Sequence, residues 1–325
     1  MRVGRLFIGS VLATFAVTTL MSSAALAEIY IPEGKAGTAL RLTSEFEPAG
    51  RIKGLGNVHG LDVALSRDLL ISASLMPVAR DGAKKDGQIS LIDLKTGKII
   101  RRIEVPGVVH HVTVGANDRY VLLTHPKLKA VSILDLETNK ITATIKTGPN
   151  PNYAVYDPKT KSFFVSVEGK STIDQIDPTK GEIVNIYKTP AGAEHLAIDV
   201  AGRRLFAAEV DAGVLSVMNL DTGAIEDTYQ IGGKLHGVAY DATRDAVYVS
   251  ARENGKIAWI DLATKKMSVE KVGPGPYHMA LDGNRLVVSS AKNNVVWVVD
   301  VTTRKIVKTI PTSARAHQMA VIPNS

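Results

Sequence analysis

A nine-residue phrase recurs six times along this chain at a nearly constant spacing. Its first copy reads Ser90-Leu-Ile-Asp93-Leu-Lys-Thr-Gly97-Lys, and an Asp or Asn stands at the fourth position of every copy. These residues are 42, 42, 42, 42 and 39 positions apart, at Asp93, Asp135, Asp177, Asn219, Asp261 and Asp300. A period near 40 residues restricts the chain to a repeat architecture.

Each copy lies within the same pattern of four short segments. In the first complete repeat, apolar segments at 60–65 and 69–74 precede the Asp-bearing segment, and a more polar one follows at 98–103. Gly or Asn at the turn after the Asp suits the positive φ of a tight hairpin. No segment has the length and 3.6-residue period of a substantial helix. The pattern therefore predicts four-stranded antiparallel blades, and hence an all-β propeller.

The two ends of the chain predict how the ring closes. Residues 316–322 repeat the first strand of a blade, and the chain then stops. Strand-like segments at 28–31, 38–43 and near 51–52 precede the first complete repeat. A seventh blade built from both termini would remove the exposed sheet edges. We therefore expect a seven-bladed β-propeller whose last blade is closed by N- and C-terminal strands.

The repeated phrase resembles the YVTN-type repeat of bacterial periplasmic propellers, including the YncE-like proteins. The resemblance covers essentially all of the chain after its first 27 residues, and the Trp-Asp pair typical of WD40 repeats is absent. It implies a seven-bladed propeller in the periplasm, and it leaves the activity open because propellers host many functions. A scaffold that binds a protein or single-stranded DNA is one function that the resemblance allows.

The first 27 residues have the features of a secretory signal peptide. Arg2 and Arg5 precede an apolar run over 6–20, and Ala25-Leu-Ala27 gives a small-residue exit. A membrane anchor is the alternative, but the small-residue exit favours cleavage. We therefore expect a single propeller domain over 28–325, periplasmic or secreted, with no membrane span after cleavage.

Composition excludes several classes of site. The chain has no cysteine, which excludes disulfides, thiolate metal sites and a lipid on an N-terminal cysteine. The formal net charge is +7, or +5 without Arg2 and Arg5, and no run of five like charges occurs. A basic surface attracts nucleic acid, but a charge this small for the length favours an ordinary soluble surface.

Seven of the eight histidines fall at one position of the repeat, the start of the first strand. They stand one or two residues before the apolar core of that strand, at His59, His110, His111, His195, His236, His278 and His317. Only the third repeat has none there and carries Pro151-Asn152 instead. Because the first strands line the channel, we expect a ring of imidazoles around one of its mouths. The rings of the adjacent pair His110-His111 should diverge unless the backbone turns there.

Three further residues are expected on the same face. Up-and-down strand order places the loop between the second and third strands beside the start of the first strand. His125 and Glu209 end second strands, and Glu194 precedes His195 at the rim. Imidazoles from several blades, completed by a carboxylate, predict a zinc, copper or iron site. An iron tetrapyrrole with an axial histidine is the secondary expectation, although no C-x-x-C-H attachment motif is present.

Other interpretations of the histidines stay open. One alternative is that each imidazole is a hydrogen-bonded brace within its own blade, as in WD40 repeats. The shift between two adjacent positions argues against one shared role. A metal-assisted lyase or hydrolase is the enzymatic alternative, with His195, Glu194, Glu209 and His236 as acid, base or ligands. We favour a binding protein for a metal ion or small ligand. A periplasmic protein partner would be compatible with this function.

Overall fold

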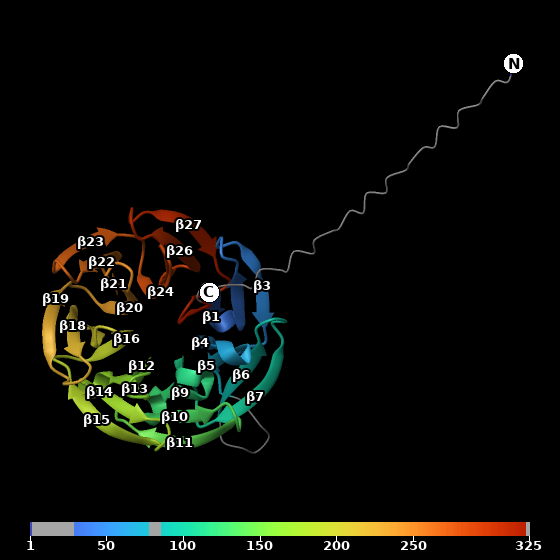
Figure 1. Cartoon of the computed structure of the whole chain (residues 1–325), viewed down its shortest axis with the longest axis horizontal. Coiled ribbons are helices and arrows are strands. Elements are labelled where there is room, and N and C mark those ends of the chain that lie inside the picture. Colours follow the sequence, from blue (N-terminus) through green and yellow to red (C-terminus); the bar gives the residue numbers. More distant parts are fainter. Residues whose placement is uncertain (2–28, 78–85, 323–325) are drawn as a thin grey trace.

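A computed structural model describes residues 29–77 and 86–322 of the chain, together with Met1. Its strands form seven four-stranded antiparallel sheets arranged as blades around a central channel (Figure 1). The described part contains no helix longer than one 3₁₀ turn. These turns are η1 (Gly34–Ala36), η2 (Leu65–Arg67), η3 (Ala116–Asp118), η4 (Pro126–Leu128) and η5 (Glu168–Lys170). The predicted all-β, seven-bladed propeller is confirmed.

Six blades are continuous in sequence, and each runs from an inner first strand to an outer fourth strand. Blades 1 and 2 comprise β4 (Val58–Ala64), β5 (Leu69–Ser74), β6 (Gly87–Asp93), β7 (Ile99–Val105), and β8 (Val112–Val114), β9 (Tyr120–His125), β10 (Ala130–Asp135), β11 (Lys140–Lys146). Blades 3 and 4 comprise β12 (Pro151–Asp157), β13 (Ser162–Val167), β14 (Thr172–Asp177), β15 (Glu182–Lys188), and β16 (Ala193–Asp199), β17 (Arg204–Glu209), β18 (Val214–Asn219), β19 (Ile225–Gln230). Blades 5 and 6 comprise β20 (Leu235–Asp241), β21 (Ala246–Ala251), β22 (Lys256–Asp261), β23 (Lys266–Lys271), and β24 (Pro276–Asp282), β25 (Arg285–Ser290), β26 (Val295–Asp300), β27 (Ile306–Pro311).

Blade 7 joins the two ends of the chain, as the sequence predicts. Its strand order is β28-β1-β2-β3, with β28 (Ala320–Val321), β1 (Ile29–Glu33), β2 (Thr38–Leu42) and β3 (Pro48–Lys53). The C-terminal strand pairs antiparallel with β1, through Val321 opposite Ile29. This pairing closes the ring by joining the C-terminal strand to the N-terminal sheet.

The recurring phrase folds into the hairpin turn between the third and fourth strands. In blade 1, Asp93 Oδ1 accepts hydrogen bonds from the backbone N–H and the hydroxyl of Thr96, each at 2.7 Å. The residue after Thr96, Gly97, has a φ of 67°, and the equivalent position has a positive φ in all six copies. Asp or Asn, Thr and Gly or Asn therefore recur because this turn favours them, although Lys265 and Arg304 take the positive-φ position in the last two copies.

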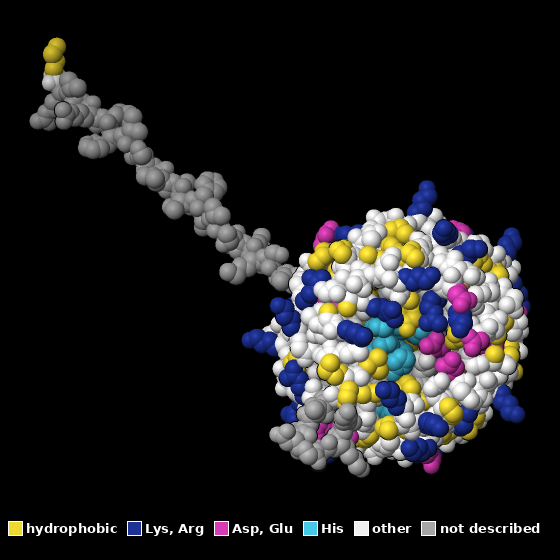
Figure 2. Space-filling view, turned by 180° about the vertical axis from the view of Figure 1, so that it is seen from behind, with side chains coloured by type: hydrophobic (Ala, Val, Ile, Leu, Met, Phe, Trp, Pro, Cys, Tyr) yellow, Lys and Arg dark blue, Asp and Glu magenta, His cyan; other side chains and the backbone are white. Residues whose placement is uncertain are grey.

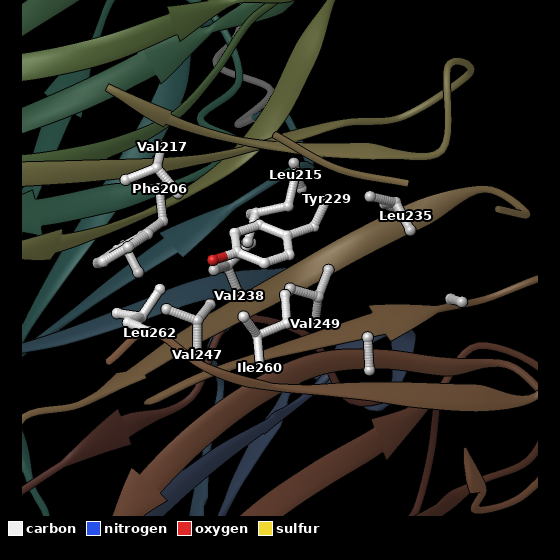
Figure 3. Packing of buried hydrophobic residues seen from close by; sticks show 14 residues of the cluster. Phe206, Leu215, Val217, Tyr229, Leu235, Val238, Val247, Val249, Ile260 and Leu262 are labelled. Carbon is white, nitrogen blue, oxygen red and sulfur yellow. The ribbon is translucent and has the colours of Figure 1, made fainter. Parts of the chain in front are cut away.

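The hydrophobic core consists of seven clusters among the described residues, one between each pair of neighbouring blades. Between blades 4 and 5, Phe206 and Leu215 of one sheet pack with Val247 and Ile260 of the next (Figure 3). Each blade thus buries both faces only when its two neighbours are present. Cohesion is spread around the ring, which leaves the inner strand starts free to carry polar side chains.

The predicted signal peptide, residues 1–27, lies outside the described residues except for Met1. Within the described ranges, no helix has the length and apolar character needed to cross a bilayer.

Candidate metal centre

The start of the inner strand departs from regular pairing in five of the seven blades. In blade 5, Leu235 pairs with Ala251, but the next regular pair joins Val238 to Val249, so the strand bulges at His236 and Gly237. The register shifts at the same place in blades 1, 3, 4 and 6. A bulge of this kind changes the direction of side chains at the edge of a sheet. Here it turns consecutive residues toward the channel.

Two consecutive residues from each blade therefore line the channel. We call the first set the mouth layer and the second set the deep layer. The mouth layer comprises His59, His110, Asn152, Glu194, His236, Tyr277 and His317. The deep layer comprises Gly60, His111, Tyr153, His195, Gly237, His278 and Gln318.

Glycine occurs in the deep layer where there is no room for a side chain. A Cβ at Gly237 would lie 2.4 Å from the carbonyl oxygen of Tyr277, and one at Gly60 would lie 2.7 Å from Gln318 Oε1. The Gln318 side chain passes Gly60 and bonds the backbone of Val112, accepting from its N–H at 3.3 Å and donating to its carbonyl at 2.8 Å. The glycines after His59 and His236 thus allow the inner strands to converge closely.

The seven channel histidines form one continuous cluster. The centroids of the His59 and His317 rings are 3.9 Å apart, and those of His195 and His236 are 4.2 Å apart. The His278 ring lies 4.7 Å from both His195 and His236. The imidazoles therefore share one space and are not separate braces within individual blades.

The adjacent pair His110-His111 is the case in which the backbone turns. Their ring centroids are 4.0 Å apart with the ring planes inclined by 50°, so the two rings do not diverge. The reason is local. Both residues precede β8, and there His110 N–H donates to the Thr124 carbonyl of β9 while Thr124 N–H donates to the His111 carbonyl. Both rings consequently face the channel.

Two groups of three histidines bring their ligand atoms within 4.8 Å of one another. One group is His59, His111 and His278, and the other is His195, His236 and His278. The Nε2 atoms of His236 and His278 are 3.4 Å apart. Two nitrogen ligands of a tetrahedral zinc ion, each about 2.0–2.1 Å from the metal, are separated by about 3.3–3.4 Å. The observed spacing therefore matches that of two ligands of one ion.

Hydrogen bonds orient two of these rings so that Nε2 is left as an acceptor. His236 Nδ1 donates to Glu194 Oε2 at 2.8 Å, and His111 Nδ1 donates to the carbonyl oxygen of Asn152 at 3.1 Å. A carboxylate or carbonyl on the far nitrogen fixes the tautomer of a metal-binding histidine and raises its basicity. Glu194 thus acts on the cluster through His236.

Five ring nitrogens of the cluster are buried and have no hydrogen-bond partner within the protein. They are Nδ1 of His59, His110 and His317, and Nε2 of His111 and His195. A buried polar atom without a partner costs about 1–3 kcal/mol. Five such nitrogens in one cluster indicate a ligand that binds them. Neutral imidazole nitrogens are suitable ligands for a transition metal ion.

Burial keeps the imidazoles uncharged. It lowers the pKa of His110 to about 4 and that of His317 to about 3. Burial, with smaller contributions from neighbouring histidines, places the pKa values of the other five channel histidines well below the usual range. At neutral pH the cluster therefore presents the form of histidine that binds metal.

His125 and Glu209 are not brought into the cluster. His125 Nδ1 donates to the carbonyl of Val108, and its Nε2 accepts from Ser132 Oγ, both at 3.0 Å. Glu209 accepts a short hydrogen bond from Ser216 Oγ. Each residue ends a second strand and binds a hydroxyl of the third strand, so both brace their own blades. His125 and Glu209 therefore lie on the expected face, but their side chains do not reach the channel.

Blade 3 contributes residues that the sequence alignment misplaced. In the sequence, Tyr153 resembles the first apolar residue of the strand core, and Pro151-Asn152 then falls at the histidine positions. The structure pairs Pro151 with Val167 and Ala154 with Val165, so that Asn152 and Tyr153 are the channel residues. The Tyr153 ring stacks on His195 with centroids 4.4 Å apart. Because Tyr153 is largely apolar, the sequence pattern did not identify it as a channel residue. Asn152 lies 42 residues after His110 and 42 residues before Glu194, and this spacing indicates the correct register.

The mouth of the channel is a hollow in one face of the molecule, with histidine side chains at its base (Figure 2). Lysine and arginine side chains border one part of the hollow, and acidic side chains border another. On the acidic part, burial together with Glu194 and Asp211 raises the pKa of Glu168. Arg252 lies over the Tyr277 ring at 5.7 Å.

The opposite end of the channel is lined differently. A cavity of about 610 Å³ opens there, and apolar residues such as Met279 and Leu281 form most of its wall. Tyr153 and Gln318 of the deep layer form its base beside Asp62. Burial raises the pKa of Asp62 to about 6. The histidine cluster thus lies between a mouth lined by Lys35, Lys292 and Arg315 and an opposite end at which no lysine or arginine is among the described lining residues.

Comparisons with known proteins agree with this architecture. No protein-family profile matches the chain. A segment of 105 residues is 29% identical to the uncharacterized protein YncE of Salmonella typhi, and it covers 31% of this chain and 29% of that protein. The match therefore spans less than a third of the length of this relative.

Two solved structures share the fold over most of the chain. Dihydro-heme d1 dehydrogenase NirN in complex with DHE has a TM-score of 0.69 and 18% identity, covering 93% of this chain and 67% of that one. The periplasmic gluconolactonase PpgL of Pseudomonas aeruginosa has a TM-score of 0.71 and 14% identity, covering 90% of this chain and 98% of that one. The chain is therefore a seven-bladed β-propeller, and about a third of it is similar in sequence to YncE.

Proposed function

We propose that this chain is a periplasmic binding protein that holds a transition metal ion in the histidine cluster. The observation that carries the proposal is the pair of Nε2 atoms of His236 and His278, which are 3.4 Å apart inside a group of buried, neutral imidazoles. Three histidines of either group would bind the ion and leave a fourth position for water or another ligand. Glu194 would orient His236 from behind.

The donor set favours zinc or copper. Nitrogen ligands without cysteine suit Zn²⁺ and Cu²⁺, and copper has the higher intrinsic affinity for such sites. Iron is the third candidate, with neutral imidazole as its ligand. A tetrapyrrole suits the cluster less well, because neighbouring imidazole centroids lie only 3.9–5.9 Å apart across the channel. That spacing fits a bare ion better than a flat macrocycle.

The periplasmic location rests on two supports. The first 27 residues have the pattern of a signal peptide. The solved propeller PpgL is itself described as periplasmic. An oxidising compartment would also agree with a metal site that uses no cysteine.

Metal binding is directly measurable on the chain after its first 27 residues, purified without a histidine tag and stripped of metal. We expect Zn²⁺ and Cu²⁺ to bind with a Kd below about 1 µM, measured by competition with a chelating dye. An ion at about 1,000 times its Kd should raise the free energy of unfolding by about 4 kcal/mol. Failure of both ions to bind in a saturable manner, with no change in Tm, would overturn the proposal.

One observation favours a second function, a metal-assisted hydrolase or lyase at the same place. The carboxylate of Glu194 reaches the channel beside His236, and burial raises the pKa of Glu194. A carboxylate beside a metal can accept a proton from bound water. Hydrolysis of a sugar lactone by the zinc-loaded protein, abolished in Glu194→Gln while zinc remains bound, would favour this function over simple binding.

A further inference from the structure

A basic hollow adjoins the histidine cluster at the mouth of the channel. Its volume is about 550 Å³, which lies within the usual range of small-molecule sites. Three cations line it, Lys35 of η1, Lys292 between β25 and β26, and Arg315 between β27 and β28. No Asp or Glu is among the described residues that line it. The hollow is therefore electropositive.

These three cations are exposed, and they differ from the basic residues that pair with buried carboxylates. Arg203 binds Asp157 at 2.9 Å, and Arg51 binds Glu33 at 2.9 Å. Within the described ranges, Lys35, Lys292 and Arg315 have no carboxylate within salt-bridge distance. Three cations from separate segments that face one cavity without acidic partners favour an anionic ligand.

The hollow reaches the candidate metal ligands directly. His59 and His317 form part of its wall, and Tyr277 adds a phenol. His59 also belongs to the group with His111 and His278. An anion bound to the three cations would therefore lie beside an ion held by that group, where it could occupy the coordination position that the histidines leave open.

We propose that this hollow binds a small organic polycarboxylate, such as a di- or tricarboxylate, which completes the coordination of the metal ion. The inference rests on the proposed metal site. A molecule with two or three carboxylates can pair with cations on three separate segments, whereas a single small anion can contact only part of them. The acidic part of the rim, with Glu168 and Asp211, would repel the same ligand and so set its orientation.

The proposal is tested by calorimetric titration of the metal-free protein with citrate at low ionic strength. We expect saturable binding that weakens with added salt. The triple variant Lys35→Gln, Lys292→Gln, Arg315→Gln should bind citrate at least tenfold more weakly. A control variant carries Lys98→Gln, Lys161→Gln and Lys305→Gln, which remove the same charge from exposed hairpin turns at the other end of the blades. It should change the affinity less than threefold.

The outcomes separate this inference from the proposed function. Citrate binding that is absent, or equal in the two triple variants, would overturn the polycarboxylate site even if zinc binds normally. Citrate binding without any zinc binding would refute the metal site and leave the anion site standing alone. Inorganic phosphate should bind at least tenfold more weakly than citrate, and equal affinity would contradict contact with several separate cations.

Discussion

Replacing His278 with alanine is expected to weaken zinc binding by at least 100-fold. This histidine belongs to both groups of three, so its removal leaves neither group with three imidazoles. A zinc ion with two protein nitrogens lacks the set typical of tight sites. The measurement is dye competition on the metal-stripped variant, with circular dichroism to show that the ring still folds. His278→Gln, which keeps more of the volume, should lose binding to a similar extent.

The matched control is His125→Ala. His125 is also buried and neutral, and burial lowers its pKa to about 4, but both of its nitrogens are hydrogen-bonded within blade 2. Its removal should reduce the free energy of unfolding by about 1–3 kcal/mol and leave the zinc affinity unchanged. Equal zinc affinity in His278→Ala and the wild-type protein would show that the cluster is not the metal site.

Acid should destabilise the metal-free protein steeply, beginning below about pH 7. All eight histidines have a pKa lower in the folded protein than the ordinary value of 6.5, mainly because they are buried. The unfolded chain therefore binds more protons, and stability rises with pH. The contribution is complete above pH 6.5 and is lost as the pH falls toward the folded values, about 4 for His110. Each histidine contributes up to about 1.4 kcal/mol per pH unit.

Buried carboxyl groups act in the opposite direction over a lower range. The pKa of Asp62 is raised by burial to about 6, so its protonation favours the folded state below that pH. The histidines should therefore dominate between pH 7 and 6. Thermal unfolding of the metal-free protein measured at intervals from pH 7.5 to 5 tests this expectation, and bound zinc should preserve Tm to lower pH. A Tm that stays constant over this range in the metal-free protein would contradict the assignment of neutral buried imidazoles.

The sequence predicted the ring and its closure because the repeat carries local information. The hairpin turn favours particular residues at fixed spacing, and blades of similar length pack in a ring. The strand after Ala316 and the segments near the N-terminus likewise predicted blade 7. These features depend on short-range patterns, which a single sequence shows directly.

The candidate site could be predicted only in part. Its seven histidines were visible because they share one position of the repeat, yet the bulges that turn adjacent residues into one channel depend on pairing with the neighbouring strand. Pairing also decides that Tyr153 faces the channel. His125 and Glu209 lie on the expected face, but hydroxyls of their own blades hold them. The hydrogen bonds that hold His125 and Glu209 leave no signal at a fixed sequence spacing, whereas the 42-residue spacing of Asn152 from His110 is such a signal for blade 3.

X-ray absorption at the zinc edge tests the central claim most directly, because it reports the atoms around the bound ion. With one equivalent of zinc, the account predicts at least three nitrogen neighbours at about 2.0 Å, with the multiple scattering typical of imidazole. A shell made only of oxygen atoms, or one without imidazole scattering, would place the ion elsewhere and contradict the account.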